Sequence, residues 1–85
     1  MLVVNKDYEL KKTIFGRKYL SNVVTGDVID INDTTEDIIK KLESNSMEME
    51  DLIDMLCKEY SANYDEIESD TTEIILQLKD LNVIL

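Results

Sequence analysis

Residues 18–36 read KYLSNVVTGDVIDINDTTE, and this stretch decides the fold class. Its first half carries short runs of β-branched and aromatic residues broken at Gly26, which is typical of strands joined by a tight turn. After Asp33, apolar residues recur at intervals of three and four, which is typical of helices. We therefore expect strands before this boundary and helices after it.

Working outward toward the N-terminus, residues 8–31 predict a three-stranded antiparallel meander. Gly16 and Gly26 punctuate the segment and can take the positive φ angles that tight turns require. The third strand of a meander lies at the edge of its sheet, where backbone amides and carbonyls stay unpaired. Alternation places Ile29 and Ile31 on one face of this strand.

Toward the C-terminus, the sequence predicts three helices at about residues 34–43, 48–60 and 65–81. Asp33 and Glu36 have the spacing of a capping box at the start of the first helix. The predicted core stripe of the third helix, spaced at three and four residues, consists of Ile67, Thr71, Ile74, Leu78 and Leu81.

Composition limits the function. An 85-residue chain has room for one domain with a small core, so we expect a single α+β domain over residues 1–85. With 19 acidic and 9 basic side chains, the net charge of −10 opposes binding to nucleic acid or to an anionic membrane. One cysteine and no histidine exclude an internal disulfide, a Cys/His zinc site and an imidazole base. We expect no catalysis and no cofactor.

The charge is divided along the chain. Residues 1–26 hold five basic and two acidic side chains, whereas residues 27–85 hold four basic and 17 acidic ones. No apolar run reaches the roughly 18 residues that span a bilayer. Residues 1–8 also lack the cationic start and cleavage site of a signal peptide. We expect a cytoplasmic protein with no membrane partner.

Several segments resemble the PqqD family, which is named for pyrroloquinoline quinone biosynthesis protein D. The resemblance covers about residues 8–85 and implies a winged-helix-like fold. It also implies binding of the leader segment of a ribosomally made precursor peptide. The segments that carry it are YLSN at 19–22, TGDVIDIN at 25–32, Ile38 and Leu42, residues 52–60, Asp70, and LKDLNVI at 78–84.

The resemblance implies two partners, the leader peptide and a maturation enzyme such as a radical S-adenosylmethionine enzyme, a leader peptidase or a cyclase. The leader would add to the third strand as a fourth strand, which is a known mode of peptide recognition. The candidate leader-binding residues lie on this strand and on the third helix: Asp27, Val28, Ile29, Asp30, Ile31, Glu68, Thr72, Ile75, Leu76 and Lys79.

The candidate leader-binding residues on the third strand and on the third helix have alternative interpretations. Asp27 and Asp30 can instead guard the edge, or the edge can pair with a second copy, so the chain is a monomer or an edge-strand dimer. On the third helix, Ile75 can belong to the core and Leu76 can be a lone exposed leucine.

Two other functions deserve comparison. Lysines and Arg17 on the first hairpin resemble the wing of a DNA-binding winged helix, but the acidic third helix would be repelled by the major groove. An acyl carrier protein is also small and acidic. The chain has no Asp-Ser-Leu site, however, and it begins with strands.

Overall fold

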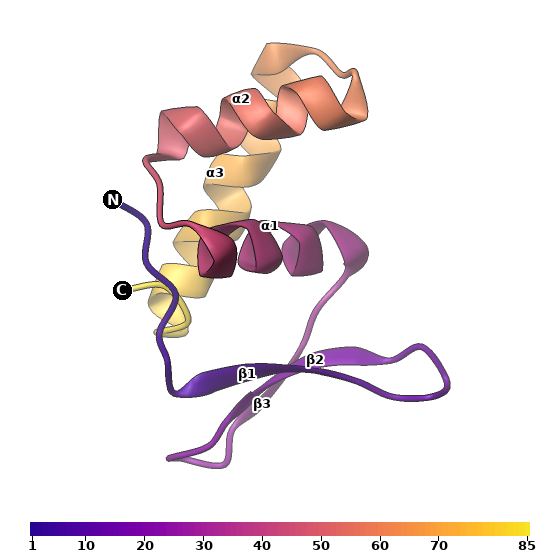
Figure 1. Cartoon of the computed structure of the whole chain (residues 1–85), viewed down its shortest axis with the longest axis vertical. Coiled ribbons are helices and arrows are strands. Elements are labelled where there is room, and N and C mark those ends of the chain that lie inside the picture. The colour runs from indigo at the N-terminus through magenta and orange to yellow at the C-terminus, as the bar shows by residue number, and fades with distance from the viewer.

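The computed structural model describes residues 1–85 and contains three strands followed by three helices (Figure 1). The α+β order predicted from the sequence is confirmed. None of the helices combines the length and apolar character needed to cross a membrane. The elements are β1 (Tyr8–Lys12), β2 (Lys18–Asn22), β3 (Val28–Asp30), α1 (Asp33–Ser44), α2 (Met49–Tyr60) and α3 (Tyr64–Asp80).

The strands form one antiparallel sheet in the order β1-β2-β3. Gly16 and Gly26, at the two turns, have φ angles of 85° and 82°, as the turn prediction requires. The predicted edge position of β3 is confirmed, and β1 forms the other edge. The two turns lie at opposite ends of the sheet (Figure 1).

The core lies between the sheet and the helices. In Figure 1, α1 lies between the sheet and α2, and α3 crosses behind α1. Fully buried side chains come from the sheet, from every helix and from the C-terminal segment. They include Leu20, Ile38, Ile39, Leu42, Leu52, Leu56, Ile75, Val83 and Ile84.

The predicted capping box is wrong, because Asn32 rather than Asp33 caps α1. The side-chain oxygen of Asn32 accepts a hydrogen bond of 2.8 Å from the Thr35 amide. Glu36 does not reach back to the cap. Its carboxylate lies 3.0 Å from the ammonium group of Lys18 on β2, so an ion pair to the sheet takes the place of the box.

The core stripe of α3 also differs from the prediction. Ile74 is half-buried and Leu81 is exposed, whereas Ile75 is completely buried. Asn82 takes a left-handed φ angle of 60° and turns the chain back after α3. Val83 then donates to the Leu78 carbonyl at 2.8 Å and fills the core. The C-terminal segment thus occupies the space that we assigned to Leu81.

Candidate peptide-binding site

The outer edge of β3 has unpaired backbone. The Ile31 amide donates to the Lys18 carbonyl at 3.1 Å, and the Asn22 amide donates to the Asp27 carbonyl at 2.8 Å. Residues of an antiparallel ladder alternate in direction, so the amides and carbonyls of Val28 and Asp30 point away from β2. Each presents one donor and one acceptor to an incoming strand.

The two faces of β3 differ in polarity, as predicted. Ile29 and Ile31 are half-buried and pack against the hydrophobic core. Val28 and Asp30 lie on the other face, where Val28 keeps 53% of its surface exposed. A strand added at this edge would therefore have an apolar face and a solvated face.

Both predicted guard carboxylates are engaged locally. Asp30 accepts a hydrogen bond of 2.8 Å from the Nε of Arg17, and this bond raises the pKa of the guanidinium. Arg17 also lies over the ring of Tyr19, 5.1 Å from its centroid. Asp27 accepts from the Thr25 hydroxyl at 2.9 Å.

An ion-pair cluster fixes the passage from β3 to α1. Lys18 contacts the carboxylates of both Asp33 and Glu36. The hydrogen bond from Lys18 holds the pKa of Glu36 below its ordinary value and does the same for Asp33. The backbone carbonyl of Lys18 also accepts a hydrogen bond from the Ile31 amide. This cluster therefore joins β2, the end of β3 and α1.

A cavity of about 220 Å³ lies beyond the C-terminal end of β3, where the first turn of α1 meets α2 and α3. Leu56 and Ile67 give it an apolar lining, and Asp70 supplies a carboxylate. The Tyr60 hydroxyl donates to Asp37 at 2.7 Å, which raises the pKa of Tyr60 to about 12. The full lining is Thr34, Leu56, Tyr60, Ile67, Asp70 and Thr71.

One residue in the α3 half of the predicted site requires correction. Ile75 has 0% of its surface exposed, so it belongs to the core and cannot line an open groove. Leu76 is 58% exposed. Successive helix residues turn by about 100°, which places Thr72, Leu76 and Lys79 across the helix from Ile67.

Glu68 is exposed on α3. It follows Tyr64 by one helical turn, and the pKa of Tyr64 is raised first by partial burial and then by Glu68 and by Asp54 on α2. The residues of α3 that line the cavity of about 220 Å³ are Ile67, Asp70 and Thr71. Helical periodicity identified Ile67 and Thr71 as apolar-face residues but could not show that they border a cavity.

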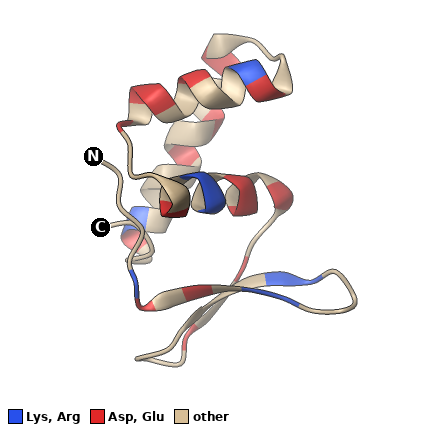
Figure 2. Cartoon of the chain, viewed as in Figure 1, with Lys and Arg blue, Asp and Glu red and all other residues tan.

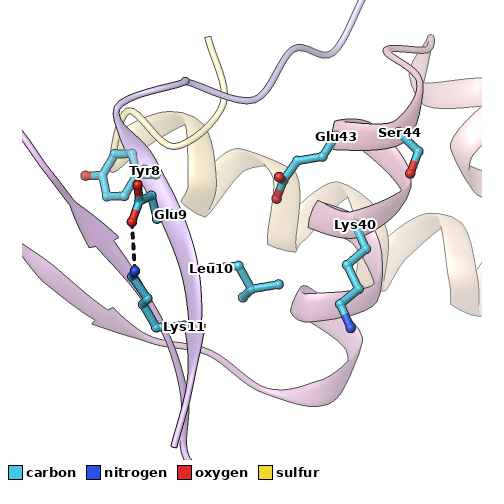
Figure 3. Close-up of a pocket in the computed structure, with 7 residues that line it drawn as sticks. All are labelled: Tyr8, Glu9, Leu10, Lys11, Lys40, Glu43 and Ser44. Atoms are coloured by element: carbon cyan, nitrogen blue, oxygen red, sulfur yellow. Dashed lines mark ion pairs between the residues drawn. The ribbon is translucent and has the colours of Figure 1, made fainter.

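The opposite edge of the sheet has a second cavity. The Thr13 amide donates to Arg17 and the Val23 amide donates to Asp7, so alternation turns the backbone groups of Leu10 and Lys12 outward from β1. A cavity of about 610 Å³ lies between β1 and α1, and the Leu10 side chain points toward α1 (Figure 3). Its lining is mostly polar: Tyr8, Glu9, Leu10, Lys11, Lys40, Glu43 and Ser44.

These features define a class, namely a small α+β domain whose three-stranded sheet has an open edge strand with an apolar face. The family model for coenzyme PQQ synthesis protein D (PqqD) matches residues 18–84, and the chain belongs to this family. No curated protein matches the chain.

Two solved structures share the fold. One, described as lasso peptide synthetase B1 complexed with the leader peptide, has a TM-score of 0.78 and 21% identity, covering 99% of this chain and 96% of its own. The other, described as TbiB1 in complex with the TbiA(beta) leader peptide, has a TM-score of 0.74 and 18% identity, covering 96% and 93%.

Proposed function

We propose that this chain binds the leader segment of a ribosomally made precursor peptide and delivers it to a maturation enzyme. Its membership of the PqqD family supports this proposal, as do two similar structures described in complex with leader peptides. The observation that carries it is the edge of β3, where Val28 and Asp30 present unpaired backbone groups beside the apolar Ile29 and Ile31.

The leader adds antiparallel to residues 27–31 as a fourth strand. Its backbone pairs with the outward amides and carbonyls of Val28 and Asp30, which supplies affinity without regard to side chains. Alternate leader side chains then face the half-buried Ile29 and Ile31, which supplies selectivity for apolar residues.

We place the second contact of the leader in the cavity beyond β3. Its Leu56 and Ile67 lining favours an apolar anchor, and Asp70 offers an acceptor to a lysine, arginine or tyrosine of the leader. Ile74, half-buried one to two turns further along α3, extends the same apolar side. This assignment replaces Ile75 and leaves Leu76 as an exposed leucine with no role.

The chain acts as a binding partner and leaves catalysis to the maturation enzyme. Lys18, Lys41 and Tyr60 take part in ion pairs or hydrogen bonds with carboxylates rather than in a nucleophile–base arrangement. We place the protein in the cytoplasm, because ribosomes make precursor peptides there.

Calorimetry with synthetic peptides tests the proposal. The leader of a precursor peptide from the genome that encodes this chain should bind at a ratio of one to one, and a peptide with the same composition in scrambled order should not. Ile67→Ala should weaken binding by about 1–3 kcal/mol, the range for an apolar anchor. A leader that binds no better than its scrambled form would refute the proposed function.

A further inference from the structure

The turn between β1 and β2, residues 13–17, exposes two large apolar side chains. Ile14 is 95% exposed and Phe15 is 92% exposed, more than any other large hydrophobic residue of the chain. Single exposed apolar residues are ordinary, but two adjacent ones at the apex of a hairpin form a projecting apolar tip. Neither belongs to the leader site described above.

Hydrogen bonds hold this tip in one shape. The Thr13 amide donates to the Arg17 carbonyl at 2.8 Å, and the Gly16 amide donates to the Thr13 carbonyl at 3.1 Å. The Arg17 amide also donates to the Thr13 hydroxyl at 3.0 Å. With Gly16 in the left-handed region, the turn is closed and Ile14 and Phe15 are presented at little further cost in conformational entropy.

The tip is also basic, although the chain is acidic. Figure 2 shows lysine and arginine on the strands leading to the turn, while the helices are mostly acidic. Lys11 pairs with Glu9 at 2.8 Å and Arg17 pairs with Asp30, whereas Lys12 takes part in no ion pair. An apolar tip with basic flanks is complementary to an apolar pocket bordered by carboxylates.

The position of the tip leaves the leader accessible. The Arg17–Asp30 pair joins the tip to the C-terminal end of β3, and the other turn lies at the opposite end of the sheet (Figure 1). An antiparallel leader would have its N-terminal end beside the tip and would leave β3 near Asp27. A partner held at the tip therefore does not cover the end from which the rest of the precursor extends.

We propose that the Ile14–Phe15 tip docks the maturation enzyme by inserting into an apolar, acid-bordered pocket on that enzyme. This inference rests on the proposed function for the identity of the partner. A folded protein fits better than a membrane, because the net charge of −10 opposes approach to anionic lipid.

The experiment uses the full chain, the synthetic leader and the purified leader peptidase or cyclase that acts on the same precursor peptide. Phe15→Ser and Ile14→Ser should each weaken enzyme binding about tenfold or more, as expected of buried interface anchors, and leave leader affinity unchanged. Lys12→Glu should weaken enzyme binding less. Val24→Ser, an exposed apolar position at the other turn, serves as the matched control and should change neither affinity.

The outcomes separate the two proposals. If the leader does not bind the wild-type chain, the proposed function fails. If the leader binds but the enzyme does not, or if both tip variants bind the enzyme normally, the docking inference alone is wrong. It is also wrong if the tip variants instead lose binding to phosphatidylcholine–phosphatidylserine vesicles, or lose self-association in analytical ultracentrifugation, while enzyme binding is unchanged.

Discussion

The two edges of the sheet, β1 and β3, face the same physical problem but have different surroundings. Both turn backbone amides and carbonyls outward, at Leu10 and Lys12 on one edge and at Val28 and Asp30 on the other. Beside β1 the surface is charged, with lysines and glutamates from both the strand and α1. Beside β3, Ile29 and Ile31 pack against the hydrophobic core, and a partly open cavity lies among α1, α2 and α3.

This difference indicates why unpaired backbone alone does not define a peptide-binding site. Charged side chains, especially lysines, protect an edge against strand addition, because pairing would require their desolvation. The charges of Lys11 and Lys12 protect β1 in this way. On β3, Asp30 is paired with Arg17, and Ile29 and Ile31 form an apolar face.

The largest expected effect, on the free energy of unfolding, comes from a residue of the shared core. Ile75→Ala should lower the free energy of unfolding by about 2–5 kcal/mol, because it removes a fully buried side chain from a small core. The adjacent Leu76→Ala is the matched control and should stay within about 0.5 kcal/mol. Urea unfolding measures both. Equal losses in the two variants would contradict the assignment of Ile75 to the core.

A smaller effect distinguishes the edges directly. Val28→Pro removes an outward amide from β3, so it should weaken leader binding by about 0.5–1.5 kcal/mol, the net value of one hydrogen bond. Lys12→Pro removes an outward amide from β1 and should leave leader affinity unchanged. Calorimetric titration compares the two. If only Lys12→Pro weakens binding, the leader occupies the other edge.

The smallest effect is the pH dependence of the junction between β3 and α1. Lys18 holds the pKa of Glu36 below its ordinary value, so the unfolded chain takes up this proton at a higher pH than the folded chain. The resulting stability is complete above the ordinary glutamate pKa and is lost as the pH falls through the lowered one. The protection factor of the Ile31 amide, which compares its exchange rate with the intrinsic rate at the same pH, should therefore fall in acid. Glu36→Gln should remove most of this pH dependence, and an unchanged profile would contradict the role of Lys18.

Much of the fold could be predicted because local chemistry determined it. Gly16 and Gly26 marked the turns, since both take positive φ angles, and alternation assigned the faces of β3. It was harder to predict which face of α3 turns toward the core. Neighbouring helix positions differ by about 100°, so choosing Ile74 or Ile75 as the inner residue depends on where α3 crosses the core.

The site was accordingly predicted in part. The edge of β3 follows from strand order, whereas the cavity at Ile67 and Asp70 requires α1, α2 and α3 to meet. Leu81 was predicted to be a core residue but is exposed. Val83 and Ile84 are buried instead, because the chain turns back to the core after Asn82. These packings join segments that are distant in the sequence, and no local pattern records them.

Mapping of backbone amides during titration with the synthetic leader tests the central claim most directly. We expect shift changes and exchange protection at Val28 and Asp30, accompanied by shift changes at Ile67 and Thr71. Leu10 and Lys12 should remain unchanged. Protection of Leu10 and Lys12, with shifts at Lys40 and Glu43 and none on β3, would contradict the assignment of the leader to the β3 edge.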